Sequence, residues 1–320
     1  MIRDYFSSWV DGWNRFWFTP ADCFSLCVMR PLVGIMLFYT HLVWSKELMT
    51  FFSKDGVIPP EYLRNSVDNS PFAWSHFFWI DSPELIWTIH IIALIVFAMF
   101  TLGMFTRVTG ILSFLITVSY ANRAAGALFG LDQMNAFLVM YLAIAPCAVH
   151  LSFDSWRRRQ RGLQPQPVST WANLITRLIQ VHLCVIYFFA GTGKLLGPAW
   201  WNGEAIWGAF ASYEYQTMDF LWLVDYPFLI HLITLVSLAW EVSYAYLVWP
   251  KLTRPIMVTM GFFVHAGIGM AMGMLTFGYI MIVANFAFVS PGLLRRIFRF
   301  AGVSPLEESG CPPGKPSATK

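Results

Sequence analysis

The stretch FFAGTGKLLGPAWW, residues 188–201, places a single ionisable side chain, Lys194, where a long apolar segment ends. Two leucines, a Gly-Pro pair and two tryptophans follow, and none of these residues can neutralise an ammonium group. An amine accepts a proton only in its neutral form, and an apolar, poorly hydrated site favours that form. Lys194 is therefore a candidate general base. A second interpretation stays open, in which the side chain simply extends to the lipid headgroups.

Other polar side chains lie close to the same boundary of the predicted membrane segments. They come from five segments, and they make the outer half of the bundle the best candidate for a polar pocket: His41, His90, Asp132, Asn135, Lys194 and His231. His265, in FFVHAGIGMAMG, lies near mid-membrane, where it is either a packing residue or a ligand contact. Trp200, Trp201 and Trp207 form an interfacial belt or stack on a ring-shaped ligand.

Two charged residues lie deeper than this group. Arg30 lies well inside the first segment, and Glu241 lies at a similar depth in the sixth. An unpaired charge at that depth is costly, so we predict that Arg30 and Glu241 pair with each other as a structural contact.

The composition determines which elements must carry these residues. The chain has 320 residues, of which 57% are hydrophobic and 12% charged. We predict an all-α, polytopic helical membrane bundle. It has about eight transmembrane spans: 21–44, 85–105, 108–125, 134–150, 171–195, 227–249, 255–272 and 275–291.

Positive charge sets the expected orientation. If the spans alternate, the basic segments at 157–161, 251–254 and 295–299 fall on one side, so both termini are predicted to be cytoplasmic. We expect an integral, multi-pass protein of a bacterial inner or plasma membrane. Residues 1–20 read as an interfacial amphipathic helix, 21–291 as the transmembrane domain, and 292–320 as a basic juxtamembrane segment with a disordered tail.

The sequence gives no sign of a disulfide framework, a metal site or a nucleic-acid interface. The five cysteines, Cys23, Cys27, Cys147, Cys184 and Cys311, are expected to be packing residues without disulfides. The sequence has no HExxH motif and no Walker-type loop, and its arginines read as topology signals. We therefore expect no metal and no nucleic-acid partner.

A series of stretches resembles the transmembrane domain of the vitamin K-dependent gamma-carboxylase family, also called HTTM, the horizontally transferred transmembrane domain. In order they are FTPADCFSLCVMRPLVGIMLFY, GMFTR (103–107), LSFDSW (151–156), YFFAGTGKL (187–195) and FFVH. The lysine motif, tyrosine-aromatic-x-Ala-Gly-x-x-Lys-Leu, is the most specific. The resemblance covers nearly the whole chain up to about residue 291.

The resemblance implies a role for the lysine. In the family, a lysine in this motif deprotonates vitamin K hydroquinone, and the activated quinol then drives carboxylation of a glutamate side chain. On this basis Lys194 is the catalytic base. The cofactor is vitamin K hydroquinone or menaquinol, and the candidate cofactor-binding residues are His265, His231, Trp200 and Trp201.

Two departures from the family pattern argue against full retention of that activity. The family has a histidine beside an asparagine at the start of the fourth span, whereas this chain reads GLDQMN there. The carboxylase's large lumenal domain is also absent, so any protein or peptide substrate is unknown.

Three functional hypotheses follow. The first is a membrane enzyme that uses a reduced quinone with Lys194 as base. The second is a non-catalytic membrane module that binds a quinone or lipid. A small-solute carrier is the third, and it is disfavoured because the polar residues form no path across the mid-membrane.

Overall fold

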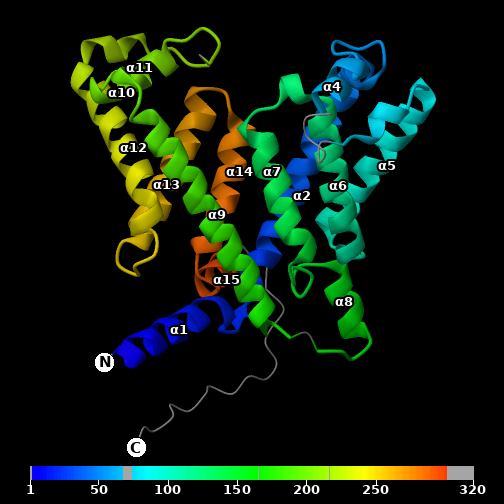
Figure 1. Ribbon diagram of the computed structural model, residues 1–320, viewed down its shortest axis with the longest axis horizontal. Coiled ribbons are helices and arrows are strands. Elements are labelled where there is room, and N and C mark those ends of the chain that lie inside the picture. Colours follow the sequence, from blue (N-terminus) through cyan, green and yellow to red (C-terminus); the bar gives the residue numbers. More distant parts are fainter. Residues whose placement is uncertain (1, 68–73, 165, 216, 301–320) are drawn as a thin grey trace, which may run out of the picture.

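The computed structural model describes residues 2–67, 74–164, 166–215 and 217–300. The protein is all-α, as predicted, with 77% of its residues in helices. Among the described residues the only strands are β1 (Ala21–Asp22) and β2 (Val168–Ser169), which pair antiparallel with Ala21 opposite Ser169. The long helices stand side by side as a bundle (Figure 1).

Each of the eight predicted spans contains a helix. These are α2 (Phe24–Trp44), α5 (Pro83–Leu102), α6 (Thr106–Arg123), α7 (Gly130–Ile144), α9 (Thr170–Lys194), α12 (Pro227–Leu247), α13 (Arg254–Ala271) and α14 (Leu275–Asn285). Four are long and apolar enough to cross a bilayer: α2 with its continuation to Phe52, α5, α9 and α12. Gly130–Ile144 and Leu275–Phe288 are shorter apolar helices. The setting is therefore a multi-pass membrane protein, while the count of eight spans stays a prediction.

Local sequence signals explain where the long helices begin and end. Ser82 and Ser169 cap α5 and α9, because their hydroxyl groups accept hydrogen bonds from the backbone N–H groups of Leu85 and Ala172. Gly103 ends α5 in the left-handed conformation, with φ of 71°. The predicted fourth span, 134–150, was misplaced: α7 ends at Ile144, because Pro146 disfavours a helical conformation at the residue before it.

The bundle divides into two groups of helices that meet at its centre. In one group α2, α5, α6 and α7 pack on one another, and in the other α9 packs on α12, and α13 packs on α12 and α14. Helix α14 joins the groups through contacts with α2, α7 and α9. Figure 1 shows α5 and α6 on one side and α12 and α13 on the other.

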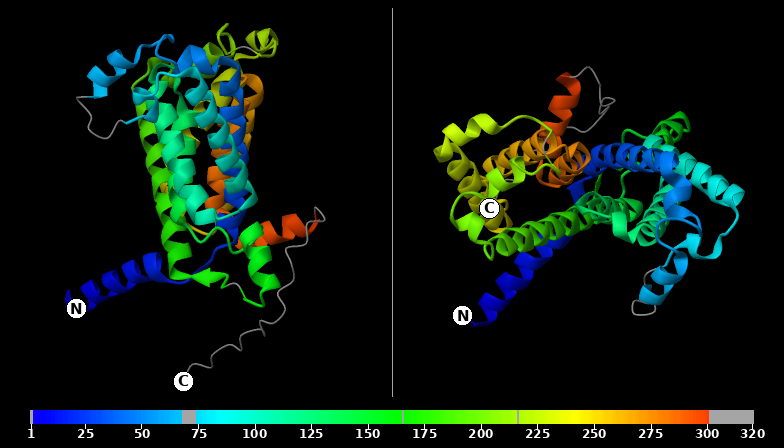
Figure 2. Two further views of the ribbon diagram at one scale, coloured as in Figure 1. Left: turned by 90° about the vertical axis from the view of Figure 1, so that its right-hand side faces the viewer. Right: turned by 90° about the horizontal axis from the view of Figure 1, so that it is seen from above.

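Shorter helices gather at the two ends of the bundle. One end, the foot of the bundle, carries α1 (Ile2–Phe18), α8 (Phe153–Gln160) and α15 (Pro291–Phe300), and α1 and α15 project sideways from it (Figure 2). The opposite end carries α3 (Leu48–Phe52), α4 (Pro60–Val67), α10 (Pro198–Trp201) and α11 (Ala205–Phe210). The 3-10 turns are Ser45–Glu47, His76–Trp79, Ala125–Ala127, Leu221–Asp225 and Phe286–Phe288.

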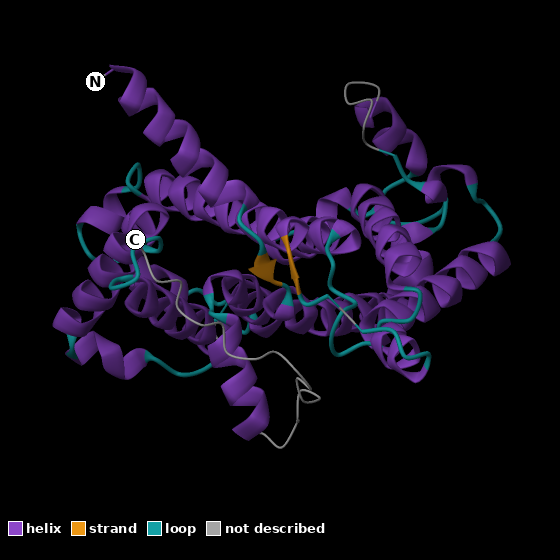
Figure 3. Ribbon diagram, turned by 90° about the horizontal axis from the view of Figure 1, so that it is seen from below, coloured by secondary structure: helices purple, strands orange, loops and turns teal. Residues whose placement is uncertain are grey.

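The basic segments at 157–161, 251–254 and 295–299 share one end of the structure. They lie in α8, in the turn between α12 and α13, and in α15, all at the foot of the bundle (Figure 1). The short β1–β2 pairing is also at this end, between the two groups of helices (Figure 3). The predicted disordered tail and Cys311 lie outside the described residues. Cys23, Cys27, Cys147 and Cys184 are buried free thiols.

The predicted contact between Arg30 and Glu241 was wrong. Arg30 is fully buried and donates hydrogen bonds to four backbone carbonyls, those of Phe100 (2.5 Å), Thr101 (2.7 Å), Cys147 (3.3 Å) and Leu151. The first two belong to the last turn of α5, where carbonyl groups lack intrahelical partners. The guanidinium therefore joins the end of α5 to the segment after α7. Sequence position could not show which carbonyl groups surround Arg30.

Candidate functional site

The lysine motif occupies one face of α9. Tyr187, Gly191 and Lys194 are spaced by four and three residues, so all three lie on the same face of the helix, which packs against α12. A Cβ atom on Gly191 would lie 3.0 Å from the backbone nitrogen of Val242, so only glycine allows this close approach. The close contact at Gly191 thus brings Lys194 next to Glu241, the residue before Val242 on α12.

Lys194 forms an ion pair with Glu241. The Nζ atom hydrogen-bonds the Glu241 Oε2 atom, and the two side chains are 30% and 12% exposed. The ammonium also lies 5.3 Å from the centre of the Trp200 ring, within the range of a cation–π contact. The lysine at the end of the apolar helix is therefore neutralised by a glutamate from another helix. An adjacent carboxylate favours the charged form of an amine.

Below the ion pair, Tyr187 belongs to a buried hydrogen-bond chain whose direction can be derived. The Asn285 Nδ2 atom donates to the Met281 carbonyl (2.9 Å), which can only accept, and this fixes the orientation of the amide. The same nitrogen donates to the Tyr187 hydroxyl (3.0 Å), and the Tyr244 hydroxyl donates to Asn285 Oδ1 (2.6 Å). We infer that Tyr187 donates its own proton to His265 Nε2, 2.7 Å away, because the opposite direction would leave the tyrosine proton without an acceptor.

This chain fixes the tautomer of His265. Since Nε2 accepts the tyrosine proton, a neutral ring carries its own proton on Nδ1. His265 is 4% exposed, and its Nδ1 atom has no hydrogen-bond partner among the residues that the structure describes. A buried donor without a partner is costly, so this nitrogen is a natural contact point for a ligand.

His265 lies at a groove between α2, α13 and α14. The groove has a volume of about 460 Å³, and its lining is mostly apolar. Its walls include Met36, Tyr39, His265, Gly269, Tyr279 and Ile282. Tyr39 and Met270 beside it are 49% and 61% exposed, so the groove opens on the outside of the bundle, which faces lipid in a membrane. A lipophilic molecule with an acceptor oxygen fits these walls and this donor.

The predicted site residues do not all come together. Trp200 contacts Lys194, but Trp201 is 64% exposed and donates its Nε1–H to the Leu195 carbonyl (2.8 Å). His231 is exposed and packs against Gly203. Of the residues predicted to form the site, only His265 lines the groove. Lys194 lies seven residues beyond Tyr187 on α9, about 10 Å along the axis at ~1.5 Å per residue.

The outer polar residues divide between the two groups of helices. His41, Asp132 and Asn135 line one cavity of about 20 Å³, and the buried atoms His41 Nε2 and Asn135 Oδ1 have no protein partner there. His90 lies nearby and bonds the Tyr120 hydroxyl through Nδ1 (2.7 Å). Lys194 and His231 belong to the other group, on α9 and α12. The polar residues predicted at the outer boundary therefore do not converge on one pocket in the described structure.

Two of the sequence motifs have a structural role. Asp154 in LSFDSW accepts hydrogen bonds from the backbone N–H groups of Phe105 (3.0 Å) and Thr106 (2.8 Å), both in GMFTR. The Thr106 hydroxyl donates to the same carboxylate (2.8 Å). Burial opposes ionisation of Asp154, but these bonds outweigh it and hold the pKa of the carboxyl below its ordinary value of 3.8. The two motifs thus cap the N-terminus of α6 in place of a local capping residue.

Sequence reasoning missed four members of the site: Tyr187, Glu241 as the partner of Lys194, Tyr244 and Asn285. The spacing of Tyr187, Gly191 and Lys194 was the available signal, because it defines a single helix face. Nothing in the sequence indicated which helix that face meets. Among the described residues, no three His, Cys, Asp or Glu side chains gather in a way that could hold a metal ion.

The comparisons agree with the motif series. The family model of the HTTM domain matches residues 18–292, which is most of the chain. Comparisons with curated proteins and with solved structures give no match. The chain therefore belongs to the HTTM domain family, which includes the vitamin K-dependent gamma-carboxylase.

Proposed function

We propose that this HTTM-domain membrane protein binds a lipophilic molecule of the quinone class in the groove between α2, α13 and α14. The observation that carries the proposal is that His265 lines the groove and that its buried Nδ1 atom has no hydrogen-bond partner among the described residues. A quinone offers an apolar ring for the walls and oxygen acceptors for this donor. Vitamin K hydroquinone and menaquinol are the candidates that the family suggests.

We further propose that Lys194 and Glu241 act together as the proton acceptor for that molecule. In the form that acts as a base, the proton shared by the pair lies on Glu241, and the neutral amine takes a proton from the ligand hydroxyl. A deprotonated quinol supplies the reactivity toward oxygen that carboxylase-type chemistry uses.

A second candidate function is binding without chemistry. Two observations favour it: Lys194 is already paired with Glu241, and Lys194 does not line the groove. In that case the ion pair holds α9 to α12, and the groove serves as a lipid or quinone site.

Binding is tested by mass analysis of lipophilic molecules that copurify with the protein. His265→Phe should lose a copurifying quinone, because the donor is gone while a ring of similar size stays. His182→Phe is the matched control, since His182 also bonds a tyrosine, Tyr141 (3.2 Å), but lies outside the groove. A quinone retained equally by both variants would refute the groove as its site.

Chemistry is tested by quinol-dependent oxygen uptake. Lys194→Arg should abolish uptake, because a guanidinium stays charged and cannot act as a base, although it keeps the positive charge beside Glu241. Lys194→Ala should be partly rescued by small added amines. A fully active Lys194→Arg variant would exclude the lysine base. A bound quinone without any quinol-dependent activity in the unaltered protein would favour the binding module.

A further inference from the structure

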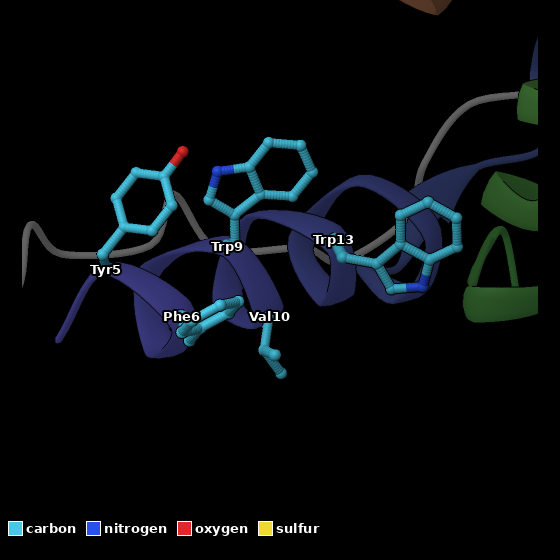
Figure 4. A pocket seen from close by; sticks show the side chains of 5 residues that line it. All are labelled: Tyr5, Phe6, Trp9, Val10 and Trp13. Atoms are coloured by element: carbon cyan, nitrogen blue, oxygen red, sulfur yellow. The ribbon is translucent and has the colours of Figure 1, made fainter. Parts of the chain in front are cut away.

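The foot of the bundle carries a helix that has little to pack against. Tyr5, Phe6, Trp9 and Trp13 of α1 are 60%, 63%, 65% and 59% exposed, and Figure 4 shows their side chains projecting from the helix. Helix α1 leaves the bundle sideways (Figure 2). An aromatic, amphipathic helix of this kind lies in the headgroup region of a bilayer. The last turn of α1, where it meets α9, therefore marks the depth of the lipid headgroups.

Two arginines meet at this level beside Trp249. Arg177 of α9 donates from Nε to the Phe16 carbonyl (3.3 Å) and from Nη1 to Gln180 Oε1 (2.9 Å). Its guanidinium lies 4.4 Å from the centre of the Phe16 ring and 5.9 Å from that of Trp249. Arg254, the first residue of α13, donates from Nη2 to the Trp249 carbonyl (2.6 Å) and from Nε to that of Val248 (3.1 Å).

These contacts leave both charges without a counter-ion. No carboxylate in the described part of the chain forms an ion pair with Arg177 or Arg254, and Nη2 of the first and Nη1 of the second bond no protein atom there. The two guanidinium groups are close enough for their charges to repel each other. Two half-buried cations side by side are unfavourable unless an anion joins them.

A third donor in the same corner also lacks a partner. The Nε1 atom of Trp17 is buried and has no hydrogen-bond partner in the described part of the chain. The Trp17 ring packs edge-on against that of Phe16 at 5.0 Å, and its carbonyl accepts a hydrogen bond from Asn173 Nδ2 (3.0 Å). Three donor nitrogens near Phe16 and Trp249 thus lack acceptors in the described part of the chain, and two of them belong to charged guanidinium groups.

We propose that Arg177, Arg254 and Trp17 bind the phosphate of an anionic phospholipid. A phosphate offers several acceptor oxygens and the negative charge that the arginines lack, and guanidinium groups suit its geometry. Basic pockets between helices at the headgroup level are the usual binding sites of such lipids. The bound lipid would hold α1 against α9 and the turn between α12 and α13. This inference is independent of the proposed quinone site.

The test measures lipid binding to the full-length protein. Native mass spectrometry of protein in neutral detergent, titrated with phosphatidylglycerol or phosphatidylcholine, gives the affinity for each lipid. The unaltered protein should prefer phosphatidylglycerol. Each of Arg177→Gln and Arg254→Gln should weaken that binding about fivefold, since one arginine near the surface contributes roughly that factor.

Two further variants make the result specific. Trp17→Phe keeps the ring and removes only the N–H, so it should weaken phosphatidylglycerol binding without loss of fold. Arg157→Gln, an exposed arginine of α8 at the same end, is the matched control and should change nothing. An equal loss with Arg157→Gln would mean diffuse surface attraction and would overturn the site. Occupancy by inorganic phosphate with no preference between the lipids would overturn the lipid assignment.

Discussion

The ion pair between Lys194 and Glu241 allows a quantitative test of the site. Glu241→Gln keeps the shape of the side chain and removes its charge, and this leaves the Lys194 ammonium at the end of an apolar helix without a counter-ion. Lys194→Met removes the other charge and keeps most of the stem. If the two groups interact as they do in the structure, the double variant should lose less stability than the two single losses added together.

The magnitude follows from burial. Glu241 is 12% exposed and Lys194 30%, so the pair lies between the buried and the exposed cases. Breaking a buried pair by removing one partner costs about 3–5 kcal/mol, and an exposed pair is worth about 0.2–1 kcal/mol. Lys194 can still reach the headgroup region, so we expect Glu241→Gln to lower the free energy of unfolding by about 2 kcal/mol. The coupling in the double-variant cycle should be of similar size.

The assay is reversible unfolding in mixed micelles with increasing SDS, followed by tryptophan fluorescence. Glu204→Gln provides a control, because Glu204 is exposed at the same end of the bundle. If the single losses add to the double loss within about 0.5 kcal/mol, the two side chains are independent and the pairing is wrong.

Three further predictions concern helix contact, capping and orientation. Gly191→Ala should lower the free energy of unfolding by about 1–3 kcal/mol, because its Cβ would lie 3.0 Å from the Val242 nitrogen. Gly193→Ala is the control and should be tolerated, because a Cβ there meets open space. Equal losses of stability would show that α9 and α12 do not meet here. Asp154→Asn should lower stability by about 1–2 kcal/mol at neutral pH. The folded-state pKa of Asp154 lies below 3.8, so the carboxylate contributes its full stability above that value and loses it as the pH falls through the folded pKa. The stabilities of variant and parent should therefore converge in acid. A difference in stability that stays constant with pH would exclude the carboxylate as the cause. A cysteine at Asn202 should react with an impermeant thiol reagent in intact cells, because the Lys194 end is predicted to face outward, and labelling only after lysis would reverse the topology.

Much of the fold could be read from the sequence, because hydrophobic segments of sufficient length have few alternatives to a helix in a bilayer. Each predicted span contains a helix, and most boundaries differ by a few residues at caps and prolines. The main boundary error, at residues 134–150, came from counting the apolar residues beyond Pro146 as helix. Apolar composition continued through that segment, but the backbone at Ala145 could not stay helical.

Neighbours across helices were not predictable. Counting about 1.5 Å per residue predicted similar depths for Arg30 and Glu241, but a count along one helix does not tell which helix a side chain meets. Arg30 bonds carbonyl groups at the end of α5, and Glu241 meets Lys194 across the contact at Gly191. Helix packing decides this, and it depends on the shapes of whole faces.

The sequence by itself determined the class of the protein, the helical segments, the family and the motif that contains Lys194, because length, apolar composition and local spacing are properties of single segments. Only the tertiary structure decided that Glu241 neutralises this lysine, that His265 lines a groove, and that Arg177 and Arg254 lie near Trp249 without an ion-pair partner in the described part of the chain. Each of these facts joins residues from different helices. The physical reason is that a bundle can bring the same helices together in many arrangements, and side-chain packing over the whole structure selects one of them.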